Sequence, residues 1–274
     1  MQKAIAFVFV FAIVGVAAIL YATPKRSGTM FTCTTFFDFQ KQNKWELFCN
    51  SMDSILAHHS RDTLGRIDRW LIVNEYSETP SCDWAERMRA RYPFMEFLQK
   101  TANQRGQAAS MNIILDAIVP YTYWIHWEDS WFPKRECLQR AFDIMDTTDI
   151  TQLQMTQHTD VPNWLNEGAH RIDCNPSYCR IFASEAIRLF LSYDPVIAKN
   201  NWDTTMRYWP LYSLLPSINR ASFYTVGTFS TDPALWPVMF EWDYARRWYW
   251  HGGKKAVLPD GPVIRRNTHV STYS

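Results

Sequence analysis

Between residues 31 and 127 the sequence alternates strand patterns with helix patterns, and this alternation restricts the fold more than any other feature. Runs rich in β-branched and aromatic residues predict buried strands at residues 31–37, 70–73, 94–98 and 121–127. Apolar residues spaced three and four apart predict helices at residues 44–59, 83–91 and 108–118. Strands that alternate with helices form a mostly parallel sheet with helices on both faces. We therefore expect an α/β, Rossmann-like fold.

The sequence after residue 130 is less regular. It predicts a helix at 184–192, a loop at 210–218 and a helix at 242–251 that stops at Gly252-Gly253. There is no internal repeat. A chain of 274 residues with 47% hydrophobic residues can bury one good core. We expect one domain over residues 30–274, preceded by a tail, an apolar segment and a linker in residues 1–29.

The apolar segment Ala4–Ala22 has no charged residue and is long enough to cross the hydrocarbon layer as a helix. It predicts a transmembrane anchor, and a cleaved signal peptide is the alternative. Lys3 precedes the segment and Lys25 and Arg26 follow it, so the flanking charges leave the orientation open. The formal net charge of +1 gives no sign of the strongly basic surface that binds nucleic acid.

Six cysteines are present, and none forms a CxxC pair, so their spacing does not favour a zinc site. Their even number suits one to three disulfides in an oxidising compartment. Cys174 and Cys179 bracket the turn-forming Asn175-Pro176-Ser177 and are the favoured local bridge. Free buried thiols are the alternative.

Polar residues follow two of the predicted strands. Asn74-Glu75 follow the second strand and Glu128-Asp129 follow the fourth. In open α/β sheets the ligand lies beyond the carboxyl ends of the strands, so both clusters mark a candidate site. The alternative for Asn74-Glu75 is an ordinary polar turn.

Four segments, in order, resemble segments of family 2 glycosyltransferases and their relatives. They are Ile72–Ser77, Asn103–Asn112, Tyr123–Ser130, and Glu241-Trp242-Asp243 followed by Arg247, Gly252, Pro259 and His269. The resemblance covers nearly all of residues 31–269. It implies a GT-A fold and transfer of a sugar from a nucleotide-sugar, UDP- or GDP-linked, to a hydroxyl of a glycan or other acceptor.

The resemblance also implies roles for individual residues. Nucleotide-sugar binding would fall to Asp38, Asn74, Glu75, Asn103, Gly106, Asn112 and Glu128. Asp129 would hold Mn²⁺ or Mg²⁺, with His269 completing the coordination unless it is only a surface residue. Two departures from the family's pattern are Asn74, where an aspartate is usual, and Ser130, where a third acid is common. Metal dependence and the identity of the nucleotide are therefore left open.

The chemistry of such a transfer explains these residue types. A departing diphosphate gains negative charge, which a hard divalent cation held by carboxylates offsets. An inverting transfer also needs a base for the acceptor hydroxyl, and Glu241 or Asp243 is the candidate. The alternative is that Glu241, Asp243, Arg246 and Arg247 form ordinary ion pairs along a helix face.

Aromatic residues are abundant in the second half of the chain. Six of the 13 tryptophans are Trp202, Trp209, Trp236, Trp242, Trp248 and Trp250, and some of these rings could stack on sugars, although tryptophan is more often a core residue. The segment from Trp209 to Ser217 corresponds to the acceptor-binding loop of the resembling proteins.

This function would suit a single-pass type II membrane protein whose catalytic domain lies in the Golgi or ER lumen, or at the equivalent membrane of a bacterial or virus-infected cell. Three other functions remain open. They are an inactive relative that binds a nucleotide-sugar or glycan, a glycoside hydrolase that uses the two carboxylate positions, and a structural membrane protein. The last gives no reason for acids at the strand ends.

Overall fold

The computed structural model describes residues 27–38, 43–78, 83–156, 170–200, 209–235 and 239–265. The predicted anchor Ala4–Ala22 and the predicted metal ligand His269 lie outside these ranges. Within them, no helix combines the length and the apolar character that a membrane crossing requires.

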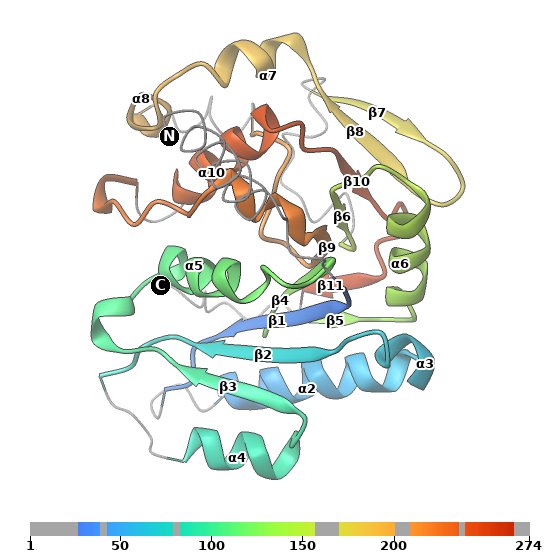
Figure 1. The fold of residues 1–274 in the computed structure, drawn as a ribbon, viewed down its shortest axis with the longest axis vertical. Helices are drawn as coiled ribbons and strands as arrows, with labels where there is room; N and C mark the ends of the chain where they lie inside the picture. Colours follow the sequence, from blue (N-terminus) through green and yellow to red (C-terminus); the bar gives the residue numbers. More distant parts are fainter. Residues whose placement is uncertain are drawn as a thin grey trace, which may run out of the picture.

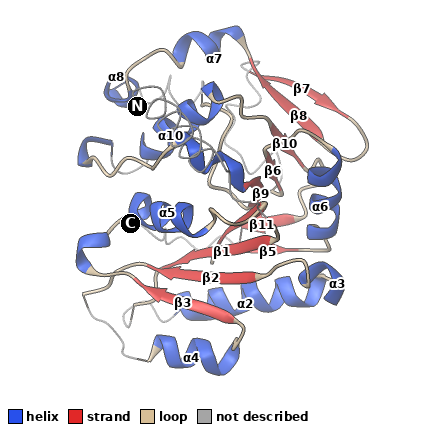
Figure 2. Cartoon of the chain, viewed as in Figure 1, coloured by secondary structure: helices blue, strands red, loops and turns tan. Residues whose placement is uncertain are grey.

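The described elements follow one another as alternating strands and helices in the first half of the chain (Figure 2). The strands are β1 (Thr29–Thr35), β2 (Arg69–Asn74), β3 (Met95–Gln99), β4 (Tyr123–Glu128), β5 (Trp131–Pro133), β6 (Gln152–Gln154), β7 (His170–Cys174), β8 (Cys179–Ala183), β9 (Ser217–Arg220), β10 (Lys255–Val257) and β11 (Val263–Arg265). The α-helices are α2 (Asn43–His58), α3 (Arg61–Leu64), α4 (Trp84–Arg91), α5 (Gln107–Ala117), α6 (Leu138–Thr147), α7 (Glu185–Phe190), α8 (Pro195–Asn200) and α10 (Met239–Trp250). Short 3-10 helices cover Ala102–Gln104, Ala221–Val226 and Pro233–Leu235.

Nine of the described strands form one sheet in the order β3-β2-β1-β4-β9-β6-β10-β8-β7, and β11 pairs with β5 separately. The pairs β3-β2, β2-β1, β1-β4 and β6-β10 are parallel, and the other four are antiparallel. Only β9 and β8 are therefore reversed among these nine strands. The predicted α/β fold with a mostly parallel sheet is confirmed.

Helices cover both faces of this sheet, as the alternation predicted (Figure 1). On one face, α2, α4 and α6 bury side chains such as Phe48, Met88 and Phe142 against Phe31 and Trp127 of the sheet. On the other face, α5, α7 and α10 bury their apolar side chains against strand residues that include Met30, Leu71 and Trp124. Odd and even positions of a strand therefore serve two separate cores.

The predicted elements of the first half are all present, with boundaries shifted by one or two residues. The helix predicted at 242–251 begins earlier, at Met239, and the predicted loop 210–218 runs into β9. Several elements were missed, chiefly α6 and the three-residue strands β5, β6, β10 and β11. A three-residue strand is too short to show a periodicity in sequence.

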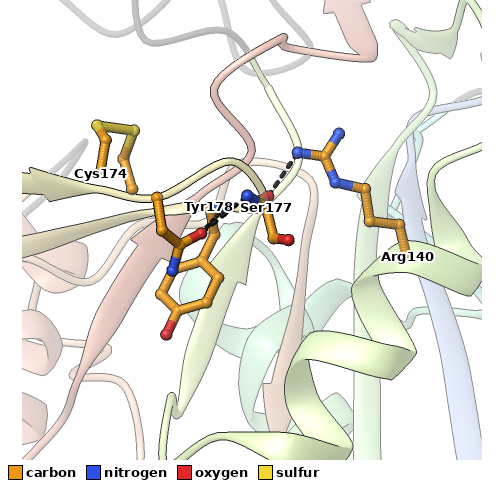
Figure 3. Close-up of a disulfide and its surroundings, with 6 residues drawn as sticks. Arg140, Cys174, Ser177 and Tyr178 are labelled. Carbon is orange, nitrogen blue, oxygen red and sulfur yellow. Dashed lines mark hydrogen bonds between the residues drawn. A yellow bond between two sulfur atoms is a disulfide. The ribbon is translucent and has the colours of Figure 1, made fainter.

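The hairpin of β7 and β8 carries the predicted disulfide between Cys174 and Cys179. Asn175 closes the turn, because its Oδ1 accepts hydrogen bonds from the backbone N–H groups of Ser177 (2.8 Å) and Tyr178 (2.9 Å). Arg140 of α6 donates to the Ser177 carbonyl and joins the turn to the rest of the domain (Figure 3). Cys33, Cys49 and Cys137 are free, buried thiols.

Replacing both bridge cysteines (C174S together with C179S) should destabilise the hairpin by about 2 kcal/mol, because the bridge closes a short loop in the unfolded chain. Hydrogen exchange of the amides of β7 and β8 measures this loss, and the wild-type protein under reducing conditions is the matched comparison. If the exchange rates in the double variant and in the reduced wild-type protein equal those of the oxidised wild-type protein, the turn and Arg140 alone hold the hairpin.

Candidate active site

Three parallel strands end at the same edge of the sheet and bring the predicted site residues together. In the register of the sheet, Thr34 of β1 lies beside Glu128 of β4, and Thr35 lies beside Asn74 of β2. The two polar clusters, 53 or more residues apart by sequence, therefore flank one strand. Their predicted position at neighbouring carboxyl ends is confirmed.

Asn74 is fully buried and joins three strand ends. Its Oδ1 accepts hydrogen bonds from Thr35 Oγ1 (2.9 Å) and from the Phe37 backbone N–H (2.7 Å). Its Nδ2 donates to Gln99 Oε1 at 2.7 Å. The side chain thus shapes the edge on which a ligand would lie, and its predicted contact with a nucleotide stays a prediction.

Glu75 forms a buried ion pair with Lys100, with 2.8 Å between Oε2 and Nζ. The same ammonium donates to the Gly106 carbonyl and to Ser110 Oγ, each at 2.8 Å. All three N–H groups of Lys100 are therefore used. Burial lowers the pKa of Lys100, and Glu75 opposes this shift. The pair fastens the end of β2 to the start of α5.

Gly106 precedes α5 with a φ of 90°, which only glycine adopts without strain. A side chain there would meet no atom within 4 Å, so the start of α5 is open. The space above this helix start would admit a ligand close to the backbone.

The other predicted nucleotide-binding residues have partners within the protein. Asp38 accepts a hydrogen bond from Ser77 Oγ at 2.6 Å. Asn103 lies in the exposed 3-10 helix Ala102–Gln104 and accepts a hydrogen bond from Thr101 Oγ1. Asn112 bonds both backbone groups of Phe229, at 2.9 and 2.7 Å, and so fixes the loop before α10 to α5. Their predicted roles remain untested.

Glu128 and Asp129 form the acidic end of β4. Glu128 accepts hydrogen bonds from Gln107 Nε2 of α5 and from Trp131 Nε1, each at 3.3 Å. Burial raises its pKa, and Arg265 and Lys44 oppose the shift. Asp129 is 0% exposed, and neither of its carboxyl oxygens has a hydrogen-bond partner among the described residues.

The environment of Asp129 disfavours its charge. Burial, with a smaller contribution from the neighbouring Glu128, raises its pKa to about 7. Lys44, the Phe36 backbone and Arg265 act in the opposite direction. Because neither carboxyl oxygen has a hydrogen bond of good geometry among the described residues, the charged form of Asp129 costs free energy in the folded state.

Two cations beside the acids were not predicted from the sequence. Lys44 lies at the start of α2 and is buried, and Arg265 ends β11, with its guanidinium 5.9 Å from the ring centre of Trp131. Both stabilise the charged forms of Glu128 and Asp129. No sequence pattern marked them, because they reach the β4 tip from opposite ends of the chain.

A divalent cation has a partial ligand set here. Within the described residues, no group of three or more His, Cys, Asp and Glu side chains is arranged to hold a metal ion. The two unpartnered oxygens of Asp129 nevertheless suit a hard cation. Mg²⁺ and Mn²⁺ need few protein carboxylates when phosphate oxygens and water complete the shell. Asp129 therefore supplies the type of ligand, a carboxylate, that such an ion prefers.

Glu241 lies in the first turn of α10 and is partly exposed. Its Oε1 accepts a hydrogen bond from the Leu214 backbone N–H at 2.8 Å. Burial, with a smaller contribution from Glu128, raises its pKa to about 7, and the Leu214 N–H and Lys255 oppose the shift. The charges of Glu241 and Glu128 therefore interact, although the two residues come from different halves of the chain.

Asp243 is held by two arginines of the same helix. Its carboxylate lies 3.3 Å from Arg246 Nη2 and 3.0 Å from Arg247 Nη2. Arg247 also donates to the carbonyls of Val226 and Thr228. Two residues along a helix turn a side chain by roughly 200°, so Asp243 and Glu241 leave α10 on different sides. Asp243 therefore forms ion pairs along the helix, which is the alternative left open above. A catalytic role for Asp243 stays a prediction.

More unpartnered polar atoms line the α10 face of the sheet. His126 of β4 and Gln154 of β6 occupy one row across the sheet, with Ser217 of β9 between them. Both ring nitrogens of His126 and the Oε1 of Gln154 lack hydrogen-bond partners among the described residues. Burial lowers the pKa of His126 to about 3, so the ring is neutral.

The tryptophans of the second half are mainly core residues. Trp209, Trp242 and Trp248 are 4%, 0% and 1% exposed, whereas Trp250 is 59% exposed. Trp202 and Trp236 lie outside the described residues. The segment from Trp209 to Ser217 packs beside α10 and supplies the Leu214 N–H to Glu241; its role toward an acceptor stays a prediction.

Comparison with known proteins gives structural matches without sequence matches. No protein-family model matches the chain, and no curated protein gives a significant match. S. aureus TarS, residues 1–349, aligns with a TM-score of 0.52 at 12% identity, over 84% of this chain and 58% of that one. The chain therefore spans less than two thirds of the TarS fragment.

Two further solved structures carry ligands in their descriptions. The mannosyltransferase PcManGT of Pyrobaculum calidifontis, in complex with GDP-Man and Mn²⁺, aligns with a TM-score of 0.52 at 13% identity, over 95% of this chain and 67% of that one. GalNAc-T7 with UDP, GalNAc and Mn²⁺ aligns with a TM-score of 0.51 at 12% identity, over 87% of this chain and 44% of that one. Identities this low establish a shared fold and nothing finer. The chain has the GT-A fold of these glycosyltransferases.

Proposed function

We propose that this protein is a glycosyltransferase that moves a sugar from a nucleotide-sugar to a hydroxyl acceptor, with Glu241 as the base. The observation that carries the proposal is the electrostatic coupling of Glu241 on α10 with Glu128 at the tip of β4. The two carboxylates are close enough for their charges to interact, which supports placing the candidate base and the acidic strand end at one site. The shared GT-A fold supports the same assignment.

In this proposal, Glu241 accepts the proton and two cations stabilise the negative charge of the leaving group. Leu214 holds Oε1 of Glu241 and leaves Oε2 to accept the proton of the acceptor hydroxyl. The acceptor oxygen then bonds to the anomeric carbon, and the bond from that carbon to the diphosphate oxygen breaks and leaves its electron pair on the diphosphate. Lys44 and Arg265 lie beside the acids where that negative charge would develop.

A divalent cation, Mn²⁺ or Mg²⁺, fits the same proposal, with Asp129 as its protein ligand and Glu128 facing the ribose or a metal-bound water. Bound there, the ion would offset the negative charge of the diphosphate. Two of the structural neighbours are described in complex with Mn²⁺ and with GDP-Man or UDP. A UDP- or GDP-linked donor is the matching choice for this chain.

The membrane anchor is likewise a proposal, based on the uncharged segment Ala4–Ala22. The disulfide between Cys174 and Cys179 suits an oxidising compartment, which supports a type II arrangement with a Golgi or ER lumenal domain, or its equivalent in another cell. We expect protease to digest the domain in sealed membrane vesicles only after detergent is added. Digestion without detergent would contradict that orientation.

The substitution E241Q should lower kcat by about 10²- to 10⁴-fold, because glutamine keeps the shape of the side chain but cannot accept the proton. The assay measures transfer from a panel of UDP- and GDP-sugars with Mn²⁺ to sugar acceptors. E185Q, which changes an exposed glutamate of α7, is the matched control and should keep full activity.

Binding of a nucleotide-sugar by the wild-type protein with no turnover on any acceptor would instead favour the inactive, ligand-binding relative. Cleavage of a glycan without any nucleotide would favour a glycoside hydrolase.

The substitution D129N should abolish transfer and also stabilise the protein above neutral pH. Because the folded-state pKa of Asp129 is about 7 and the ordinary value is 3.8, the wild-type protein loses stability as pH rises from about 4 to 7. Asparagine has no such charge, so the gain should be about 1–2 kcal/mol at pH 5 and about twice that or more at pH 8. Thermal unfolding at both pH values measures it.

The same unfolding assay tests the cation. Mn²⁺ with UDP or GDP should raise the Tm of the wild-type protein and of D116N, which changes an exposed aspartate of α5, but not that of D129N. An equal Tm rise in D129N would place the ion elsewhere.

A further inference from the structure

Lys255 is a buried lysine on the face of the sheet that α10 covers. In the sheet it lies beside Gln152 of β6, which lies beside Asn219 of β9, which in turn pairs with Trp124 of β4. Residues paired in this way point to the same face, and Trp124 belongs to the core beneath α10. Lys255 is 1% exposed, so its side chain is enclosed on that face of the sheet.

The ammonium of Lys255 contributes little to the fold. Its Nζ has no hydrogen-bond partner among the described residues. Gln152 and Asn219, its neighbours in the row, hydrogen-bond to each other at 2.9 Å and do not depend on it. Lys100, by contrast, has three acceptors. A buried ammonium without partners costs free energy, so an apolar side chain of similar size would serve packing better.

Hydrogen bonds connect the neighbourhood of Lys255 to Glu241. Gln152, which lies beside Lys255 in the sheet, donates to the Ser213 carbonyl at 2.8 Å and accepts from the Ser213 N–H at 3.1 Å. The next residue, Leu214, donates to Glu241 Oε1 at 2.8 Å. Lys255 and Glu241 therefore lie on the same side of the sheet, on either side of one short backbone segment.

The charges of Lys255 and Glu241 influence each other. Burial lowers the pKa of Lys255 to about 7, and Glu241 is the group that opposes this shift. Lys255 in turn lowers the pKa of Glu241, whereas burial and Glu128 raise it. The other groups that face Glu241 are the Leu214 N–H, which also lowers its pKa, and Tyr212, whose own pKa Glu241 raises. Among these groups, Lys255 supplies the only positive charge.

We propose that Lys255 is a positioning residue that acts through Glu241 and keeps its carboxylate free to accept the acceptor's proton at neutral pH. This inference rests on the proposed function. A base works best when its pKa lies near the operating pH. Burial and Glu128 raise the pKa of Glu241, and the positive charge of Lys255 limits that rise, so more of the carboxylate is free at neutral pH.

The test is K255M, which keeps the approximate length of the side chain and removes the charge. The protein should fold with an equal or higher Tm, since the unpartnered ammonium is lost. In a plot of kcat against pH, the rise on the acidic side (the acidic limb) should move to higher pH, because Glu241 loses the cation that favours its charged form. If the limb moves by one pH unit, kcat in acidic buffer should fall about tenfold, and activity should return in alkaline buffer.

K254M is the matched control, because the adjacent Lys254 pairs with Asp149 at the surface and should leave the limb in place. A K255M enzyme that loses kcat equally at every pH, or in which only KM rises, would overturn the inference. The first result would mark a structural role and the second a direct substrate contact.

A measurement without turnover separates this inference from the proposed function. Carbon-13 NMR of labelled glutamate side chains, with E241Q to assign the signal, follows the titration of Glu241 itself. An upward shift in K255M supports the coupling even if no nucleotide-sugar is consumed, a result that would overturn only the proposed function. An unmoved titration would overturn the inference whatever the enzyme transfers.

Discussion

The parallel pairing of β1 with β2 and β4 determines where the polar groups of this protein lie. It brings the carboxyl ends of the three strands to one edge, with Glu128 beside Thr34 and Asn74 beside Thr35. Sheet, helices and loops then surround these groups and exclude water, so each charge depends on its few neighbours. The raised pKa values of Asp129 and Glu241 and the lowered pKa of Lys255 follow from this enclosure.

The buried polar residues of this protein are of two kinds. Asn74 and the pair of Glu75 with Lys100 are fully hydrogen-bonded and hold strands and helices in place. Asp129 and Lys255 are equally buried, but their charged atoms have no hydrogen-bond partner among the described residues. Buried groups that weaken the fold are common at functional sites, where a substrate or ion supplies the missing partner. This contrast separates the residues that build the site from those proposed to act in it.

The first half of the fold could be predicted from the sequence because each strand and helix there is long enough to show its own periodicity. The acidic tip of β4 and the helix that carries Glu241 could be located for the same reason. The strands β6 and β10 could not, since three residues carry no period, and their places in the sheet come from partners far along the chain. Lys255 and Arg265 were therefore missed. The pairing of Asp243 with Arg247 was foreseen only as an alternative, because helix spacing alone does not show which side of α10 faces the sheet.

The central claim is that the β4 tip and the start of α10 serve one hollow in which a nucleotide-sugar binds. A crystal structure with Mn²⁺ and UDP or GDP tests it most directly. We expect the diphosphate to lie beside Asp129 and the open start of α5, with Glu241 across the hollow from it. A nucleotide bound at any other edge of the sheet, or Asp129 and Glu241 opening onto separate surfaces, would contradict the account.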